Sequence, residues 1–449
     1  MRVAVIGAGI AGLTAAYALR RAAERDRRPL DLVVLEAGER AGGHATTLHD
    51  DGFRVETGPN GFLSGAPDTE ALVAELGLEN DVVEVFPAAR QRFLLRGGRL
   101  HRLPLSPAGW LTTGALSLGG RVRMALEPWV RSEAPPGEES VYDFARRRFG
   151  RESAETLADA VVAGTCAGDA AALSMQAAYP AVAAMERSHG SLVRAMIARR
   201  RAGIPMPSLR SFTGGISMLT EALATRLGFS LRLHSKVVGL APAAGGWRVE
   251  FANGNADWAE RVILAVPATS AKRFLAASHP ELARLAEAPP AAGVAVVAFA
   301  WRSSDLAHPL NGYGYVVPGR ERLLTLGMVW ESSLFPARAP AGWVLVRAML
   351  GGIRSPGAVS LSDPELRHHA LTEATTLLGV RRPPRRVWVL RRPHAIAQYT
   401  PGHRERLARL RAAAALLPGL EFCGASFDGI SFNAAVASGA SAAQHIWRT

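Results

Sequence analysis

The first 36 residues constrain the fold of this chain most, because a strand, a glycine turn, a helix and an acidic residue follow one another there. The apolar run Arg2–Ile6 leads directly into Gly7, Gly9 and Gly12, and residues 14–20 are typical of a helix. In such a unit the three glycines permit, in order, the tight turn, the approach of a diphosphate to the backbone, and close packing of helix on strand. The sequence therefore predicts a dinucleotide site in a Rossmann-type α/β domain.

A second predicted strand, residues 30–35, places a carboxylate beside this turn. It ends in Glu36, which is positioned to accept hydrogen bonds from the ribose hydroxyls of an adenosine. The diphosphate is expected on the unpaired N–H groups at the helix start. The residues predicted to bind the cofactor in this region are Gly7, Ala8, Gly9, Ile10, Ala11, Gly12 and Glu36.

Composition narrows the class of protein. A chain of 449 residues, 48% of them hydrophobic, can fold into two or three soluble domains. The net charge is +13, and Lys236 and Lys272 are the only lysines among 52 Lys and Arg residues. One explanation for the excess of arginine is codon bias. The other is a functional role, in which the positive charge attracts an anionic lipid surface or a polycarboxylate substrate. We expect no nucleic-acid partner, because no RNA- or DNA-binding motif is present.

The cysteines and the hydropathy pattern indicate the cellular compartment in which the protein is expected. Cys166 and Cys423 are the only cysteines, which excludes a disulfide scaffold and fits a reducing compartment. No His/Cys cluster has metal-ligand spacing, so we expect no metal. Because a core strand is predicted to start at residue 2, we expect no signal peptide. We also expect no spanning helix, because no run of 18 residues is predominantly apolar. We expect a cytoplasmic protein.

Several motifs along the chain resemble those of one flavoenzyme superfamily. Glu36, followed by an arginine and by Gly42–Gly43, resembles the FAD-binding start of the flavin amine oxidases. The chain departs from the family pattern at His44, where Arg or Lys is common, and at Ala434, where an acid is usual. Later segments are similar, in the same order, to motifs of the oxygen-dependent protoporphyrinogen oxidases; they are residues 56–62, 163–169, 332–336, 398–399 and 424–433.

The resemblance implies FAD-dependent oxidation of protoporphyrinogen IX to protoporphyrin IX, with oxygen as acceptor, in porphyrin and haem biosynthesis. The flavin N5 accepts hydride, so we expect no catalytic side chain. The FAD is expected to be non-covalent, because Cys423 lacks the Gly-Gly-Cys-Tyr setting of amine oxidases that attach their flavin. The further residues that the resemblance places at the FAD are Gly42, Gly43, Gly58, Pro59, Asn60, Gly61, Val237, Ile430, Ser431 and Phe432.

The resemblance also implies a substrate site. Arg92 stands where the family places the arginine that pairs with a propionate, and a guanidinium can bond a carboxylate in two places. Gly164 would let the backbone approach the macrocycle, although helix termination also explains a glycine there. The residues matching the family's apolar slot, which could equally be plain sheet core, are Tyr313, Val316, Val329 and Met349.

We expect an α/β fold whose domains interleave along the chain. Residues 1–87, 207–268 and 405–449 are assigned to a Rossmann-type FAD-binding domain. Residues 88–206 are assigned to a helical, membrane-associated domain. Residues 269–404, with several predicted strands that include 294–301 and 343–350, are assigned to a mixed-sheet domain that binds the substrate.

Residues 110–131 have the composition of a helix lying at a membrane interface, on the cytoplasmic side. Arginines are expected on the remaining faces, toward headgroups. A surface helix packing its apolar stripe on the core fits the same pattern, and Pro128 should kink or end the helix. The stripe consists of Val122, Ala125, Leu126, Trp129 and Val130, with Trp110 and Leu111 upstream.

Three other functions remain open at this level. Coproporphyrinogen III carries four propionates and would draw on more cationic pocket residues, which the arginine surplus permits. Flavin amine oxidases commonly use an active-site lysine, but Lys236 and Lys272 lie beside the predicted adenine-side strands. A redox-silent FAD-binding scaffold is the third. The sequence does not determine the oligomeric state, and a homodimer is one of the states it allows.

Overall fold

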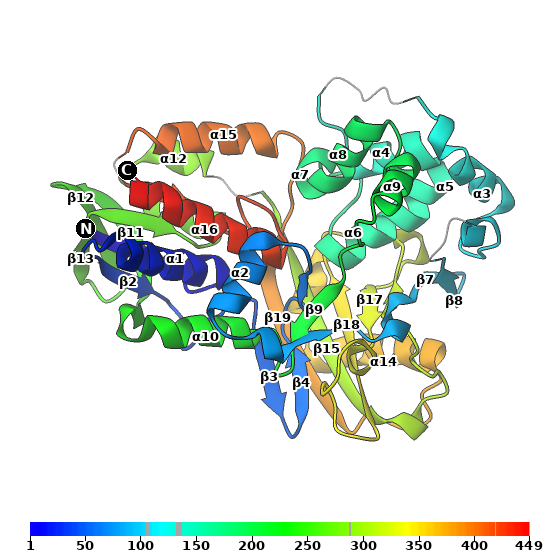
Figure 1. The fold of residues 1–449 in the computed structure, drawn as a ribbon. Coiled ribbons are helices and arrows are strands. Elements are labelled where there is room, and N and C mark those ends of the chain that lie inside the picture. Colours follow the sequence, from blue (N-terminus) through cyan, green and yellow to red (C-terminus); the bar gives the residue numbers. More distant parts are fainter. Residues whose placement is uncertain (105–107, 132–136, 287–288, 418, 449) are drawn as a thin grey trace.

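In the computed structural model the chain forms a Rossmann-type half, a second half built on a large mixed sheet, and a helical part beside them (Figure 1). The structure describes residues 1–104, 108–131, 137–286, 289–417 and 419–448. The chain passes between these parts several times. Helices α1 (Ile10–Asp26) and α16 (Phe432–Arg448) come from opposite ends of the chain and lie side by side.

The Rossmann-type half is built on a five-stranded parallel sheet in the order β10-β2-β1-β14-β20. Its strands are short and mostly apolar, because other elements cover both faces of the sheet. Strands β1 and β2 pair in register from Arg2 with Asp31 to Ile6 with Leu35. The strands are β1 Arg2–Ile6, β2 Asp31–Leu35, β10 Leu231–Arg232, β14 Arg261–Leu264 and β20 Leu420–Phe422.

Helices cover one face of this sheet, and a small sheet with three helices covers the other. Gly439 lets α16 cross α1 closely, since a Cβ there would lie 2.1 Å from the Ala11 carbonyl oxygen. The first face carries α1, α16, α2 Pro67–Glu75 and α10 Ser217–Leu227. The second carries β11 Val237–Ala243, β12 Gly246–Phe251, β13 Ala256–Ala259, α11 Ala268–Leu275, α12 Pro280–Leu285 and α15 His403–Ala414.

The second half is a seven-stranded sheet in the order β19-β15-β18-β17-β16-β7-β8. Its neighbours are antiparallel except β16 and β7, which pair in parallel. Helix α14 (Asp363–Leu378) packs on one face over buried Phe299 and Trp301. The strands are β7 Arg92–Arg96, β8 Arg99–Leu103, β15 Ala291–Arg302, β16 Gly314–Val316, β17 Thr325–Val329, β18 Trp343–Gly351 and β19 Arg386–Ala397.

Two small sheets connect the halves. In the β3–β4 hairpin, Phe53 and Val55 pack against Ala298 and Leu345 of the large sheet. The short helix α13 (Glu331–Leu334) follows β17. The strands of the small sheets are β3 Thr47–Asp50 with β4 Phe53–Glu56, and β5 Phe62–Leu63, β9 Leu209–Phe212 and β6 Val82–Glu84.

The helical part occupies the side of the molecule away from the Rossmann-type half (Figure 1). Glu127 is fully buried at its centre, where it accepts hydrogen bonds from Arg148, Ser191 and the Leu192 N–H. Helix α6 packs on β16 and β17. The helices are α3 Leu118–Ala125, α4 Val141–Phe149, α5 Arg151–Ser153, α6 Asp159–Cys166, α7 Met175–Ala178, α8 Pro180–His189 and α9 Leu192–Arg201.

The α/β fold with a mixed sheet agrees with the prediction, but two predicted domain boundaries differ from the packing. Strands β7 and β8 lie within the range assigned to the helical domain, 88–206, yet they pair in the large sheet because Phe93 and Leu95 complete its core. Helices α11 and α12 lie within 269–404, apart from the first residue of α11. They pack on the Rossmann-type half, because Phe274 and Leu282 fill its second core.

Candidate cofactor and substrate site

The first glycine turn has the geometry expected for a diphosphate cradle. Gly7 has φ +103°, and a Cβ there would lie 2.5 Å from the Ala265 carbonyl oxygen. A Cβ on Gly12 would lie 2.0 Å from the Gly7 carbonyl oxygen, so helix and strand require a glycine. A Cβ on Gly9 would meet no protein atom within 4 Å. The space above Gly9 is therefore open, and α1 begins there with no side-chain cap and no acidic residue in its first turn.

Glu36 organises this turn through both oxygens of its carboxylate. Its Oε2 accepts a hydrogen bond of 2.8 Å from the Ala8 N–H, and Oε1 accepts one of 2.9 Å from the Gly38 N–H. A carboxylate oxygen has a second lone pair, so these bonds leave acceptors for ribose hydroxyls. The Ser235 N–H donates to the Glu36 carbonyl oxygen, which brings the predicted adenine-side residue Val237 to the same edge.

The Gly42–Gly43 pair contacts the same cradle. The Gly42 N–H donates to the Ala8 carbonyl oxygen at 2.8 Å, and a Cβ on Gly43 would lie 3.1 Å from the Gly9 Cα. Beside this pair, burial and the charge of Arg392 lower the pKa of His44. Both effects favour the neutral imidazole, so this position supplies less positive charge than Arg or Lys would supply.

The segment Gly58–Gly61 requires its glycines for close backbone contacts. A Cβ on Gly58 would lie 2.2 Å from the His44 carbonyl oxygen, and one on Gly61 would lie 2.0 Å from the Arg210 carbonyl oxygen. Asn60 lies between these two glycines; its Oδ1 is buried and has no hydrogen-bond partner among the described residues.

The terminal motif brings the start of α16 toward this region. Ser431 caps the helix, since its Oγ accepts a hydrogen bond from the Ala434 N–H at 3.1 Å. Asn433 then fixes the helix to the segment that contains β5, with its Nδ2 donating to the Leu63 carbonyl oxygen. Ile430 packs against the core of the helical part, and Phe432 packs near Phe62 with ring centroids 6.2 Å apart.

The predicted substrate residues form one chain of contacts with the cofactor segment. The Asn60 Nδ2 donates to the Tyr313 hydroxyl at 3.3 Å. The guanidinium carbon of Arg92 lies 5.1 Å from the centre of the Tyr313 ring. Arg92 is exposed, and no carboxylate of a described residue forms an ion pair with it. A cation, an aromatic ring and the Gly58–Gly61 segment therefore adjoin one another.

The remaining slot residues fall into two neighbouring groups. Val329 is buried in a cluster that half-buried Tyr313 and Met349 contact. Val316 lies against α6, where a Cβ on Gly164 would lie 2.7 Å from the Val316 Cγ1. Gly164 therefore permits the close crossing of α6 over β16, which accounts for the glycine whether or not substrate approaches it.

Sequence reasoning missed a buried network of two acids and two arginines beneath this site. Arg347 donates from Nη1 to the Gly58 carbonyl oxygen at 2.9 Å and from Nε to Glu331 at 2.8 Å. Arg338 lies 3.1 Å from Glu56. All four side chains are at most 2% exposed. Burial raises the pKa of Glu56 to about 7, against the attraction of Arg338. No motif links these four positions, so only the fold brings them together.

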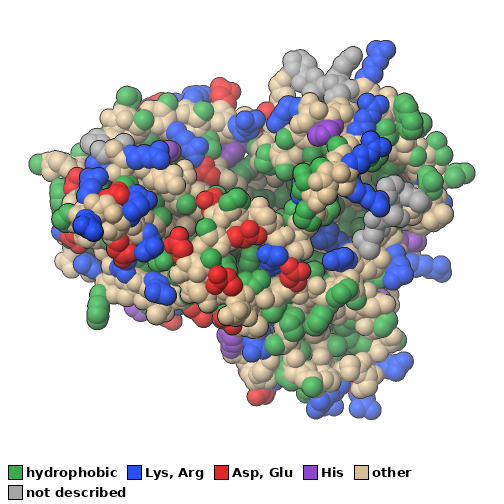
Figure 2. All heavy atoms as spheres, viewed as in Figure 1, with side chains coloured by type: hydrophobic (Ala, Val, Ile, Leu, Met, Phe, Trp, Pro, Cys, Tyr) green, Lys and Arg blue, Asp and Glu red, His purple; other side chains and the backbone are tan. Residues whose placement is uncertain are grey.

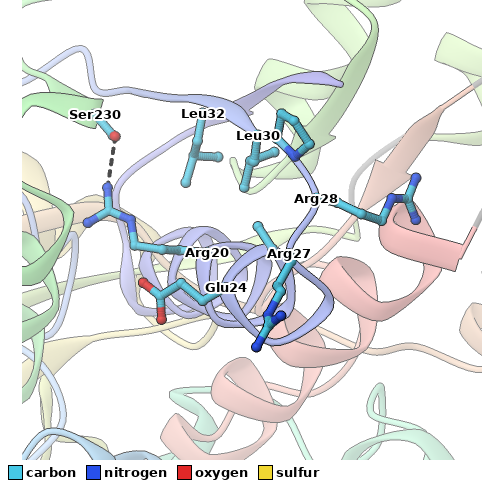
Figure 3. Close-up of a pocket in the computed structure, with 9 residues that line it drawn as sticks. Arg20, Glu24, Arg27, Arg28, Leu30, Leu32 and Ser230 are labelled. Atoms are coloured by element: carbon cyan, nitrogen blue, oxygen red, sulfur yellow. Dashed lines mark hydrogen bonds between the residues drawn. The ribbon is translucent and has the colours of Figure 1, made fainter.

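Two surface pockets differ in how close they lie to the glycine turn and Glu36. One, of about 640 Å³, lies between the last turns of α1 and the start of β2, where Arg20 donates to Ser230 (Figure 3). The second is lined by residues that include His234, Ser235 and Asn253, and it adjoins the predicted ribose end of the site, because the Ser235 N–H donates to the Glu36 carbonyl oxygen. Ligands of parallel α/β sheets bind beyond the carboxyl ends of the strands, and the first pocket lies at the amino end of β2.

The described residues contain no group of three His, Cys, Asp or Glu side chains able to hold a metal ion. Among the described helices, none combines the length and hydropathy needed to cross a bilayer. The open cradle at Gly9 and the unpartnered Oδ1 of Asn60 are features that FAD would fill, and the residues present fit that cofactor.

Comparison with known proteins agrees with this geometry. The family described as flavin containing amine oxidoreductase matches residues 10–447. The chain therefore belongs to the flavin-containing amine oxidoreductase family, and FAD is its cofactor.

Individual relatives within the family carry names that specify an activity. Human protoporphyrinogen oxidase is 34% identical over 479 residues, covering 100% of this chain and 98% of the human protein. Coproporphyrinogen III oxidase of Bacillus subtilis (strain 168) is 28% identical, covering 95% of this chain and 94% of that protein. A crystal structure from Exiguobacterium sp. 255-15, assigned provisionally as a protoporphyrinogen oxidase, has a TM-score of 0.86 and 26% identity, covering 99% and 98% of the two chains.

Proposed function

We propose that the chain oxidises protoporphyrinogen IX to protoporphyrin IX, with oxygen as the acceptor, in porphyrin and haem biosynthesis. The observation that carries the proposal is the contact chain from Arg92 through Tyr313 to Asn60, which joins a cation free for a carboxylate to the segment beside the cofactor. The full-length identity with human protoporphyrinogen oxidase supports it.

The chain's own residues bind and orient the macrocycle. Arg92 pairs with a propionate, and Tyr313, Val329 and Met349 provide an apolar surface for the ring. The bound FAD supplies the hydride-accepting chemistry. The Arg347 hydrogen bond to the Gly58 carbonyl oxygen holds the backbone of the cofactor segment in place.

The test is aerobic turnover of protoporphyrinogen by the purified, FAD-loaded chain. Six hydrogens leave the macrocycle, so three molecules of oxygen are reduced to three of hydrogen peroxide for each porphyrin formed. We expect porphyrin fluorescence to rise with that oxygen uptake, and Arg92→Ala to slow it at low substrate. Porphyrin formation no faster than in enzyme-free buffer would contradict the proposal.

Coproporphyrinogen III is a second candidate substrate, favoured by the similarity to the Bacillus subtilis enzyme of that name. It carries four propionates, so its binding would need cations in addition to Arg92. Comparing kcat/KM for the two porphyrinogens decides between them. A ratio above about tenfold in favour of coproporphyrinogen would replace the first assignment.

We also propose that the region 110–131 contacts the cytoplasmic surface of a membrane. In support, Leu118 is 72% exposed, Leu126 49% and Trp129 73%, and hydrophobic side chains gather on the outer edge of the helical part (Figure 2). Arg121 and Arg123, expected to face headgroups, instead donate to backbone carbonyl oxygens of their neighbours. Insertion of apolar side chains therefore contributes more to the proposed membrane binding than attraction of these two arginines to headgroups does.

A further inference from the structure

A cluster of basic side chains lies beside the cofactor segment without a compensating acid. Arg392 comes from β19 of the large sheet, and its Nη2 donates to the Thr57 Oγ1 at 2.9 Å. Its Nε is buried and has no hydrogen-bond partner among the described residues. His44 and Arg40 are close enough to interact electrostatically with this guanidinium.

The cluster lies between the two glycine segments of the cofactor site. Thr57, which accepts the hydrogen bond from Arg392, directly precedes Gly58, where an added Cβ would meet the His44 carbonyl oxygen. Gly43, directly before His44, adjoins Gly9. Arg392 is therefore a residue of the large sheet that adjoins the segments flanking the diphosphate cradle of the other half.

The charge of this cluster is uncompensated by the protein. No carboxylate of the described residues lies within 4.0 Å of the charged nitrogens of Arg392 or Arg40. Burial, with the nearby Arg40, lowers the pKa of Arg392. A partly buried cation whose Nε is shielded from water is stabilised when an anion pairs with it. The adjacent Arg391 shows the ordinary arrangement, because it pairs with Asp363 at 2.6 Å.

We propose that Arg392 pairs with the diphosphate of the bound FAD. The diphosphate is the part of FAD that is anionic whenever the flavin is oxidised, and the glycines adjoining the cluster are those that admit it. The proposal rests on FAD being the cofactor, not on the identity of the substrate. It assigns to β19 a positive charge that the family commonly places at position 44, where this chain has His44, and it makes FAD a link between the two halves.

The test compares Arg392→Gln with the matched control Arg391→Gln in the full-length apoprotein, titrated with FAD, ADP and riboflavin. ADP carries the diphosphate without the flavin, and riboflavin carries the flavin without the phosphates. We expect Arg392→Gln to raise the Kd for FAD and ADP by about tenfold or more, since a charged hydrogen bond is lost. Riboflavin affinity should stay within about twofold, and Arg391→Gln should leave all three affinities unchanged.

Two results would overturn the proposal: an FAD Kd unchanged by Arg392→Gln, or equal weakening of FAD and riboflavin with ADP unaffected, which would place the guanidinium at the flavin ring. Should the variant not fold, the wild-type chain decides. Phenylglyoxal should modify Arg392 in the apoprotein, and ADP, but not riboflavin, should protect it. Equal modification with and without ADP would then refute the proposal.

Discussion

At the scale of single residues, Arg92 is the side chain on which substrate recognition depends. It is exposed at the start of β7 and lies over the Tyr313 ring. We predict that Arg92→Ala raises KM for protoporphyrinogen about tenfold or more, with a smaller change in kcat, because a propionate loses its charged partner. Arg92→Lys should rescue it only in part, since a lysine cannot bond a carboxylate in two places. Unchanged KM in both variants would remove Arg92 from the site.

Glu56 gives the molecule a pH-dependent contribution to stability. Burial raises its pKa from 4.5 to about 7 in the folded state. Between these values the folded state keeps a proton that the unfolded state has released, so the free energy of unfolding falls as pH rises through this window. Once the pH exceeds 7, the stabilisation that has been lost amounts to at most about 3 kcal/mol. We predict that Glu56→Gln flattens this fall, measured by urea unfolding of the holoprotein between pH 5 and 8.

The control for Glu56 is Glu365→Gln, because that carboxylate is exposed at the start of α14 and its pKa is lowered rather than raised. Its variant should keep the wild-type fall in stability across the same window. Identical pH dependence of wild type and Glu56→Gln would mean that Glu56 is ionised throughout.

Site residues could be predicted from the sequence where their contacts are with residues nearby in the chain. They could not be predicted where their contacts are with residues distant in the chain. Gly7 and Gly12 could be predicted because they belong to one short strand–turn–helix unit. Such a unit requires the same close backbone contacts in any chain that forms it. Glu331, Arg338 and Arg347 could not, because their partners become neighbours only when β4, β18 and α13 pack. Arg392 was missed for the same reason, because it lies near Thr57 only in three dimensions.

At the scale of elements, the strands of the large sheet were the best predicted. Apolar runs near 294–301 and 343–350 predicted most of β15 and β18, because these central strands are largely buried and their residues are mostly apolar. Strands β7 and β8 were assigned to the helical domain, since two short strands between helical segments carry little periodicity of their own. Their partners in the sheet determine their structure.

The element that follows α3 tests the membrane proposal. Helix α3 ends at Ala125, and Pro128 lies in a short 3-10 turn that leaves Trp129 exposed. We predict that Leu126→Ser with Trp129→Ser abolishes co-sedimentation with anionic liposomes, because exposed apolar area supplies the binding. The FAD spectrum and the melting temperature should stay close to wild type.

The matched control for that double variant is Leu416→Ser, a leucine that is 84% exposed on the Rossmann-type half and should not affect liposome binding. Loss of the flavin or of folding in the double variant would show that the stripe belongs to the core. Undiminished liposome binding by a folded double variant would exclude this region as the contact.

At the scale of the whole molecule, both halves contribute to one cofactor site, and we predict that the FAD is held without a covalent bond. Cys423 and Cys166 are both buried, and burial raises the pKa of each thiol, which disfavours the thiolate. Acid precipitation should leave yellow FAD in the supernatant, measured by absorbance. Flavin that pellets with the protein would indicate a covalent attachment.

In the proposed reaction, bound FAD takes its electrons from a porphyrinogen. Anaerobic mixing of the FAD-loaded chain with protoporphyrinogen and, separately, with coproporphyrinogen measures that step without oxygen. We predict that protoporphyrinogen bleaches the visible absorbance of the flavin at a rate that saturates with substrate concentration. Arg92→Ala should raise the half-saturating concentration, and admitting oxygen should restore the colour. Flavin that stays oxidised with both porphyrinogens, in a folded holoprotein, would contradict the proposed reaction.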